Sequence, residues 1–377
     1  FTEYNALRRI LLFQWRIFQY ISCRFDHLVH EDMNAMTDTN ERRCLALYSG
    51  GLDSILAIRI LQGQGVEVIP LYFCTPFFGF DALRDPEAFK HDHRARHGLD
   101  IRIVDYTEDL ISILKAPRHG FGRHMNPCID CKIGMLKRAR SLLETMHATF
   151  VITGEVVGQR PMSQRRSIMR AIERQSGLEG ILLRPLCARK LPETLPERLG
   201  VVERNALWDI SGRGRKKQIE RALDYGMDED TIPTPAGGCL LTDEQISRKV
   251  RGTFDRCSPG LPGKADLLMD IMGRKYLLDD STVLVVARDD GENQVISTFT
   301  DPGNVFLKMV DVSGPLCVIR GKVSDENLRT AAGVCLRYGK ARGVPGHAAE
   351  YGADPADMTE SIEAPVLTEE YCRTLQD

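Results

Sequence analysis

The sequence lacks the features of membrane-embedded and secreted proteins. No apolar run in its 377 residues approaches the length that crosses a bilayer, so we expect no membrane association. The 11 cysteines are odd in number and widely spread, and no secretory signal is expected ahead of them, which argues against a disulfide framework. We therefore expect a cytoplasmic protein whose cysteines serve metal or sulfur chemistry in a reducing compartment.

The chain also lacks a strong excess of charge of either sign. It has 50 Lys and Arg residues against 52 Asp and Glu residues, a formal net charge of −2. The chain as a whole is therefore not an electrostatic nucleic-acid binder, and any RNA contact must come from local basic patches. Its length predicts two or three domains. Residues 1–36 are expected to be an extension outside the fold, with Met36 as an alternative start.

One stretch, Leu45–Ser54, organises the rest of the chain. A short apolar run leads into Ser-Gly-Gly-Leu-Asp-Ser, and a second apolar run follows, which predicts a strand, a tight turn and a helix. The two glycines let the backbone approach a ligand closely, and the amides at the helix start favour an anion. Asp53 is suited to the magnesium ion that accompanies a nucleotide. The Gly-Lys-Ser/Thr ending of a Walker loop is absent, and an ordinary strand-to-helix turn is the alternative interpretation.

Strands and helices are expected to alternate over residues 42–204. The expected strands are apolar runs and cover 45–48, 66–73, 101–106, 150–153 and 181–186. The expected helices cover 54–62, 86–97 and 126–146. This alternation predicts an α/β fold with a doubly wound, mostly parallel sheet, whose ligand sits beyond the carboxyl ends of the strands. Tyr48, Phe73 and Gly154 fall at those ends.

The rest of the chain divides into three further segments. Residues 205–262 are expected to hold a basic helix at 205–225 and a Pro- and Gly-rich loop that presents Cys239. Residues 264–342 are expected to form a smaller α+β domain. Its expected strands cover 275–278, 283–288, 295–298, 305–310 and 316–320. The tail, 343–377, is rich in Gly, Pro, Ala and acidic residues and is expected to be loosely ordered.

Cys128 and Cys131 form a Cys-x-x-Cys pair at an expected helix start. Both thiols face one way there, and the helix dipole lowers thiol pKa values. Such a pair alone is open to three interpretations: a redox pair, half of a zinc site, or coincidence. A four-cysteine zinc site needs a second pair, and the sequence has none. Together with Cys239, the three thiols match an iron–sulfur cluster with one open iron.

Several of these segments carry a family resemblance. Four of them resemble the tRNA thiouridylases of the ATP-pyrophosphatase (PP-loop) superfamily: Ser49–Ser54, Asn126–Cys131, Thr153–Gln164 and Ala236–Cys239. A fifth block, Leu183–Leu186, is similar to one in the 4-thiouridine synthetases. The series of short expected strands in residues 264–342 resembles the RNA-binding domain of the ribosome-quality-control factors.

The resemblance implies an ATP-dependent tRNA sulfurtransferase, which adenylates a uracil carbonyl of tRNA and replaces its oxygen with sulfur. The implied cofactors are ATP, Mg²⁺ at Asp53, and a 4Fe-4S cluster on Cys128, Cys131 and Cys239, with a persulfide relay between cysteines as the alternative. The implied partners are tRNA and a sulfur donor, either a cysteine desulfurase, a persulfide carrier or sulfide. The implied ATP-binding residues are Tyr48, Ser49, Gly50, Gly51, Asp53, Ser54, Phe73 and Gly154.

Two basic runs are suited to tRNA phosphates, although a solvated surface is the alternative interpretation. The expected RNA-binding residues are Arg160, Arg165, Arg166, Arg213, Arg215 and Lys216. Two other functions compete with tRNA thiolation. Another PP-loop adenylating enzyme, forming amides or thiolating a small molecule, would have no use for the basic runs. A non-catalytic RNA- or ribosome-binding protein with a relic nucleotide fold would have no use for Asp53 or the three thiols.

Overall fold

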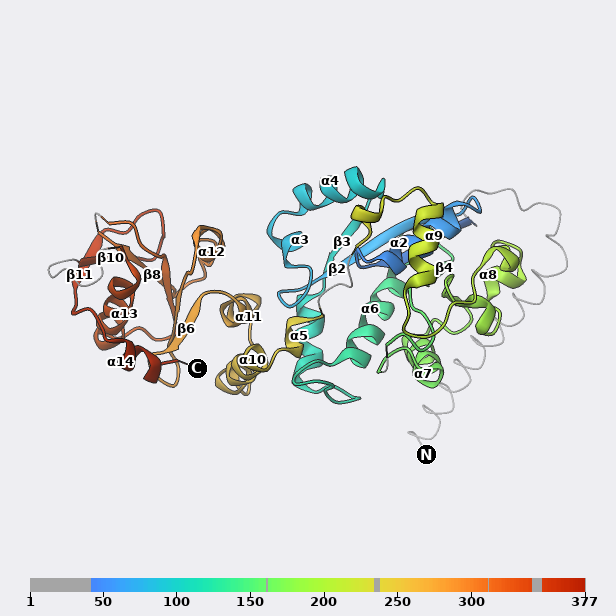
Figure 1. Ribbon diagram of the computed structural model, residues 1–377. Helices are drawn as coiled ribbons and strands as arrows, with labels where there is room; N and C mark the ends of the chain where they lie inside the picture. Colours follow the sequence, from blue (N-terminus) through green and yellow to red (C-terminus); the bar gives the residue numbers. More distant parts are fainter. Residues whose placement is uncertain (1–41, 161, 234–237, 311, 341–347, 377) are drawn as a thin grey trace, which may run out of the picture.

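The computed structural model describes residues 42–160, 162–233, 238–310, 312–340 and 348–376. The extension expected at 1–36 and residues 234–237 of the loop before Cys239 lie outside the described residues. Two sheets organise the described chain, one parallel and one antiparallel (Figure 1). None of the helices in the described ranges is long and apolar enough to cross a membrane.

The first sheet has five parallel strands in the order β3-β2-β1-β4-β5, which confirms the predicted doubly wound α/β fold. The strands are β1 (Arg43–Tyr48), β2 (Glu67–Cys74), β3 (Arg102–Asp105), β4 (Phe150–Thr153) and β5 (Leu182–Leu183). Successive side chains of a strand point to opposite faces. In β1, Ala46 and Tyr48 enter one hydrophobic core, whereas Leu45 and Leu47 enter another.

Helices cover both faces of this sheet. One core is shared with α2 (Leu52–Gln62) and α9 (Lys216–Asp224), and the other with α5 (Thr107–Lys115), α6 (Cys128–Leu142) and α7 (Arg166–Ser176). Three further helices complete this region: α3 (Phe80–Arg84), α4 (Pro86–His97) and α8 (Leu195–Arg198). Because β1 runs directly into α2, the amino end of α2 lies at the carboxyl edge of the sheet, where a ligand is expected.

The second sheet has six antiparallel strands in the order β11-β10-β8-β9-β7-β6. The strands are β6 (Arg274–Leu277), β7 (Val283–Val286), β8 (Val305–Met309), β9 (Cys317–Arg320), β10 (Ala348–Gly352) and β11 (Glu360–Glu363). The core that includes Ala331 and Cys335 joins α13 (Asp325–Tyr338) to this sheet. A separate core, which contains Phe299, joins α12 (Asp290–Ile296) to it. α14 (Glu369–Thr374) ends the described chain.

Two helices, α10 (Glu244–Cys257) and α11 (Lys264–Ile271), connect the two sheets (Figure 1). Leu267 of α11 packs in the core beneath the parallel sheet, whereas the next residue, Leu268, packs against the antiparallel sheet. Lys264 Nζ also binds Asp105 Oδ2 at 2.8 Å, at the end of β3. A single helix therefore shares its side chains between both regions.

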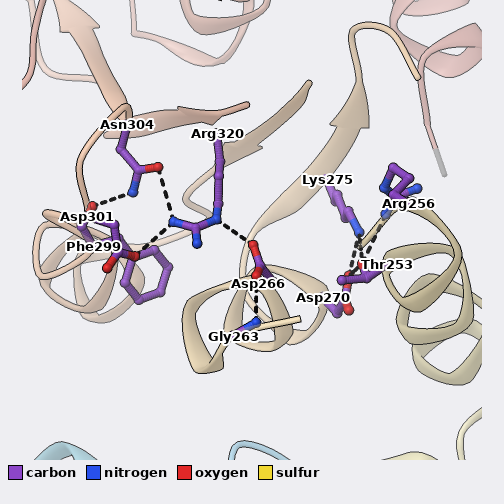
Figure 2. Close-up of polar contacts among 10 residues, drawn as sticks. All are labelled: Thr253, Arg256, Gly263, Asp266, Asp270, Lys275, Phe299, Asp301, Asn304 and Arg320. Carbon is purple, nitrogen blue, oxygen red and sulfur yellow. Dashed lines mark hydrogen bonds and ion pairs between the residues drawn. The ribbon is translucent and has the colours of Figure 1, made fainter. Parts of the chain in front are cut away.

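Buried polar groups reinforce this connection (Figure 2). The ammonium group of Lys275 in β6 pairs with Asp270 of α11 and donates to Thr253 Oγ1 of α10 at 2.9 Å. Both charged side chains are at most 1% exposed. Arg320 of β9 pairs with Asp266 of α11 in a second cluster. Because a buried charge without its partner is unstable, these pairs fix α10 and α11 against the antiparallel sheet.

The helix predicted at 205–225 is wrong over its first half. Only α9 is α-helical there, after a single 3-10 turn at Arg204–Ala206. Ser211 instead forms a parallel bridge with Val157, and the amide of Gly212 donates to the Val157 carbonyl at 2.9 Å. Gly212 has a φ of +92°, which glycine adopts easily and a helix does not allow.

Two expectations for the C-terminal region are also wrong. The strand predicted at 295–298 is instead the last two residues of α12 and the turn that follows, because Asp289 caps that helix by accepting the amide of Glu292 at 2.9 Å. The tail predicted to be loosely ordered supplies β10, β11 and α14. Its apolar residues are few but well placed: Ala349 and Cys372 are buried in the antiparallel-sheet core.

The fifth strand of the parallel sheet is also shorter than predicted, covering Leu182–Leu183 alone.

Candidate active site

The glycine turn between β1 and α2 has the predicted strand–turn–helix form. Gly50 has a φ of +72°, and Gly51 precedes the first turn of α2. The hydroxyl of Ser54 donates to the Gly51 carbonyl at 2.7 Å and accepts the amide of Ser49 at 3.3 Å. These bonds hold the turn closed while the free amides at the helix start remain available to an anion.

Asp53 lies in the first turn of α2 with one oxygen satisfied and one not. Its Oδ2 accepts the side-chain amide of Gln159 at 3.0 Å, whereas its buried Oδ1 has no partner among the described residues. Burial raises the pKa of Asp53, although the Gln159 bond and the charges of Arg215 and Arg160 oppose that rise. A buried carboxylate oxygen without a partner fits the oxygen ligand that Mg²⁺ prefers.

Other polar groups around Asp53 are also left without hydrogen-bond partners. The side-chain amide of Gln218, a fully buried residue of α9, interacts with Asp53 and lowers its pKa, although neither amide atom reaches hydrogen-bond geometry with a described residue. The charges of Arg215 and Arg160 act on Asp53, so these two residues of the predicted RNA set lie beside the turn. Arg215 is further anchored by a 2.9 Å bond to the Pro233 carbonyl. The surroundings of Asp53 therefore suit a phosphate-bearing ligand.

Three more residues predicted to bind ATP, Gly154, Tyr48 and Phe73, differ in their surroundings. Gly154 passes so close to α2 that a Cβ atom there would lie 2.5 Å from the carbonyl carbon of Asp53, so only glycine fits. Tyr48 is 3% exposed and Phe73 is 6% exposed. Phe73 stacks edge-on against Tyr106 at 5.7 Å, so its side chain belongs to the core and only its backbone faces the sheet edge.

His93 of α4 was not singled out from the sequence as a site residue. Its Nδ1 lies 2.8 Å from the hydroxyl of Tyr48. Its Cε1 lies 3.3 Å from the position that a Cβ atom would take if Gly50 carried a side chain. Its ring also contacts those of Phe89 and His97, which flank it at a spacing of four residues. That spacing, which places three rings on one helix face, is the signal that could have found it. Burial, and then the neighbouring His97, lower the pKa of His93.

A buried ionic cluster beneath the site was also missed. Glu155 lies two residues after the end of β4, and Arg184 directly follows β5. The Arg184 guanidinium donates to Glu155 Oε2 at 3.3 Å, to Glu173 Oε2 at 2.8 Å and to the Met169 carbonyl at 3.2 Å. Burial alone would raise the pKa of Glu155, but Lys132 and Arg184 outweigh it and lower that pKa. Charged residues shortly after apolar strands were the available signal.

The three candidate cysteines lie in one region. Cys128 is the first residue of α6 and is exposed, and Cys131 lies one turn later, as predicted. Cys239 is partly exposed, and the next residue, Leu240, donates its amide to the Phe77 carbonyl at 3.0 Å. Cys131 and Cys239 both pack against the core beneath the parallel sheet. The loop that presents Cys239 is therefore anchored on the face that carries α6.

The electrostatics of these thiols differ from the prediction. Burial, and then the neighbouring Cys239, raise the pKa of Cys131 to about 12, so the helix dipole does not lower it. Burial likewise raises the pKa of Cys239 to about 12. Within the described ranges, no three His, Cys, Asp or Glu side chains are grouped so as to hold a metal ion. The donor set suits iron and sulfur in kind, and its role as a cluster site stays a prediction.

The remaining basic residues are on the surface. Arg165 and Arg166 are exposed at the amino end of α7. Lys216 is 90% exposed and lies 3.9 Å from Glu220 one turn along α9, a pair that contributes little. Arg213 lies in the loop after Gly212. Their contact with RNA stays a prediction.

Both regions of the chain are similar to known families. Residues 39–192 match the family model described as thiamine biosynthesis protein (ThiI). Residues 273–374 match the model described as NFACT protein RNA binding domain. The chain joins a ThiI-type domain to an NFACT-type module. Both resemblances predicted from the sequence are thereby confirmed.

The similar proteins share only part of their length with this chain. The probable tRNA sulfurtransferase of Thermococcus kodakarensis is 27% identical over 169 residues, which are 44% of this chain and 42% of that protein. This chain thus spans less than half the length of that curated relative. A solved 4-thiouridine synthetase–RNA complex with bound ATP matches at 22% identity and a TM-score of 0.37, over 54% of this chain and 45% of that one. The U34-tRNA thiolase NcsA from Methanococcus maripaludis, solved with its 4Fe-4S cluster, matches at 17% identity and a TM-score of 0.29, over 62% and 72%.

Proposed function

We propose that this protein is an ATP-dependent tRNA sulfurtransferase. In the proposed reaction a uracil carbonyl oxygen of tRNA attacks the α-phosphate of ATP, and pyrophosphate leaves. A sulfur nucleophile then attacks the activated carbon, and AMP leaves with the former carbonyl oxygen. The observation that carries the proposal is the glycine turn, with its free helix-start amides beside the unpartnered Oδ1 of Asp53. The ThiI-type family match supports it.

The residues around the turn have separate roles in this proposal. The amides at the start of α2 bind the phosphates, and Asp53 holds the accompanying Mg²⁺ through its unpartnered oxygen. Arg160 and Arg215, which lie beside Asp53, offset the negative charge that develops as pyrophosphate leaves. His93 supports the turn through Tyr48 and through its contact with Gly50.

Cys128, Cys131 and Cys239 serve the sulfur step in the proposal. One arrangement is a 4Fe-4S cluster on the three thiols, which would supply sulfide at its open iron. The other is a persulfide relay, in which one of the three thiols carries the transferred sulfur. The donor, whether a cysteine desulfurase, a persulfide carrier or sulfide, comes from outside the chain.

Two measurements on the full chain test the proposal. Pyrophosphate release from ATP is measured with and without tRNA, and tRNA nucleosides from cells lacking the protein are examined by mass spectrometry. A tRNA sulfurtransferase shows tRNA-dependent release, and one thiouridine disappears from those cells. Pyrophosphate release that is the same with and without tRNA would instead support another PP-loop adenylating enzyme. No release at all would support a non-catalytic RNA- or ribosome-binding protein.

A further inference from the structure

A continuous groove follows α6 away from the cysteine pair. It is formed by two cavities of about 710 and 440 Å³, which share Lys137, Ser141 and Gln175 as lining residues. The larger cavity lies between α5 and α6 and reaches Asp130, which stands between Cys128 and Cys131. The smaller one continues between α6 and α7. The groove therefore reaches the first turn of α6, which carries the cysteine pair, although neither cysteine lines it.

Four exposed cations line the α6 and α7 sides of this groove, namely Lys137, Arg138, Arg140 and Arg174, whereas Arg166 and Arg170 lie outside its lining on the preceding turns of α7. We define the cation track as Lys137, Arg138, Arg140, Arg166, Arg170 and Arg174, all of which are exposed. Arg166, Arg170 and Arg174 recur every four residues on one face of α7, about 6 Å apart at the helical rise of 1.5 Å per residue. No side chain of the track makes an ion pair or hydrogen bond with another residue in the described part of the chain. The track is thus a row of charges without intramolecular partners.

The carboxylates that line the groove all belong to the larger cavity. Glu108 and Asp109 line the α5 wall of the larger cavity, whereas no carboxylate lines the smaller one. Asp130 is already occupied, because its carboxylate accepts the amide and faces the Nδ1 of His119, both at 2.8 Å. The buried hydroxyl of Tyr106 lines the larger cavity and has no partner among the described residues. The groove therefore offers phosphate-binding charge along α6 and α7 and one unused hydrogen-bonding group.

The net charge of the chain is unevenly distributed, and the region that carries the groove is the basic one. Residues 42–263 contain 34 Lys and Arg residues against 27 Asp and Glu residues, whereas residues 264–377 contain 12 against 19. The region matching an RNA-binding family is thus acidic, and acidic surfaces repel phosphates. In Figure 1, α5 and α6 lie between α7 and this acidic module.

We propose that the cation track binds the sugar–phosphate backbone of the RNA substrate and leads it past Cys128 and Cys131. This inference rests on the proposed function, because it names the surface that holds the tRNA. The ammonium and guanidinium groups bind phosphates without regard to base sequence. The NFACT-type module contributes little to the electrostatic part of the affinity, because its net charge has the wrong sign.

The test compares two triple variants of the full chain. The track variant carries Lys137→Gln, Arg170→Gln and Arg174→Gln, and it keeps Arg140, whose guanidinium packs against Gly177. The control variant carries Lys322→Gln, Arg329→Gln and Lys340→Gln, which remove three exposed cations from the NFACT-type module. The tRNA dissociation constant is measured over a range of salt concentrations. ATP affinity and thermal melting show that each variant is folded.

The track variant should bind tRNA about tenfold more weakly or worse, with a salt slope reduced by about 2–3, since each lost phosphate contact removes about 0.7–0.9. The control variant should retain the wild-type slope. The inference is overturned if the control loses the slope instead, or if both variants keep it while the wild type still thiolates tRNA. A wild-type chain that binds no tRNA at any salt concentration would overturn the proposed function together with the inference.

Discussion

The two regions of the molecule place their buried charged groups differently. In the ThiI-type domain, the unpartnered oxygen of Asp53 and the amide of Gln218 lie around the glycine turn at the carboxyl edge of a parallel sheet. In the NFACT-type module, the buried charge of Lys275 is matched by Asp270 within the connection to α10 and α11. Parallel strands end at a common edge, where loops converge, whereas antiparallel strands end alternately at both edges. The first arrangement favours ligand binding and the second favours rigidity.

The substitution of Asp53 should have the largest effect. In Asp53→Asn, pyrophosphate release should fall by at least about 100-fold, because the unpartnered carboxylate oxygen that would hold Mg²⁺ is replaced. The matched variant in the other region is Asp270→Asn, which should retain pyrophosphate release while losing about 3–5 kcal/mol of stability, since it leaves Lys275 buried without its counter-charge. Pyrophosphate assays and urea unfolding check both. Undiminished pyrophosphate release from Asp53→Asn would show that Asp53 is no more important for the reaction than Asp270.

The pH dependence of stability should distinguish Asp53→Asn from the wild type. Burial raises the folded-state pKa of Asp53. The stability that this group contributes is therefore fully present below its unfolded-state pKa and is lost as pH rises through the folded-state value. Asp53→Asn stays neutral throughout, so it should gain stability relative to the wild type as pH rises from acid toward neutrality. Thermal melting across that window measures the difference, and a constant difference would contradict the assignment.

Substitutions of cysteines in the two regions should also differ in their effect on thiolation. Single changes Cys128→Ala, Cys131→Ala and Cys239→Ala should each abolish thiolation while leaving pyrophosphate release intact, because only the sulfur step uses these thiols. Cys372→Ala is the control from the NFACT-type module, where Cys372 is buried in the antiparallel-sheet core and should not matter for thiolation. Anaerobically purified wild type should contain about four irons per chain if the thiols hold a cluster. Full thiolation by an iron-free preparation would leave the persulfide relay.

The fold and the glycine turn were predictable because they depend on local patterns. Apolar strands alternating with helices determine a parallel sheet, and the glycines of the turn are needed for its backbone conformation, as the φ of Gly50 confirms. The error at 295–298 has a local cause as well: three apolar or β-branched residues indicated a strand, but the cap at Asp289 favours a helix. In the tail, composition indicated disorder, although Ala349 and Cys372 are buried in the core and further apolar residues, among them Ile362 and Leu367, pack against it.

The site residues that were missed depend on contacts distant in sequence. Arg184 meets Glu155 across 29 residues, and His93 meets Tyr48 across 45. No short motif encodes such a pairing, because it depends on which strands are neighbours and on where α4 packs. The thiol pKa values were mistaken for the same reason: the dipole of α6 is visible in the sequence, whereas the burial of Cys131 is not.

Breaking the buried cluster under the site should cost stability. Arg184 is 3% exposed and compensates both Glu155 and Glu173, so Arg184→Met should lose about 3–5 kcal/mol in urea unfolding. The paired variant is Lys275→Met together with Asp270→Leu, which removes both charges of the other buried pair and should be nearly neutral. A nearly neutral Arg184→Met would show that the two carboxylates are satisfied without the guanidinium.

The smallest expected effect concerns His93, the contact between α4 and the glycine turn. In His93→Phe the ring packing is kept but the bond to Tyr48 is lost, so KM for ATP should rise about three- to tenfold with kcat little changed, the range that one hydrogen bond supplies. His97→Phe is the control, because His97 shares the ring stack and has no recorded contact with Tyr48 or Gly50. Equal KM values for the two variants would show that α4 does not support the turn.

Acidification should reveal the same contact through stability. Burial and His97 lower the folded-state pKa of His93, so its contribution is fully present above the unfolded-state pKa near 6.5 and is lost as pH falls through the folded-state value. His93→Phe has no proton to gain and should therefore lose less stability than the wild type when the pH is lowered below 6.5. When Nδ1 of the neutral ring accepts the Tyr48 hydroxyl, protonation ends that bond, so the KM of the wild type should move toward that of His93→Phe over the same window. A wild-type KM that does not respond over this window would show that Nδ1 donates to Tyr48 instead, and the KM of His93→Phe itself should not respond to this titration.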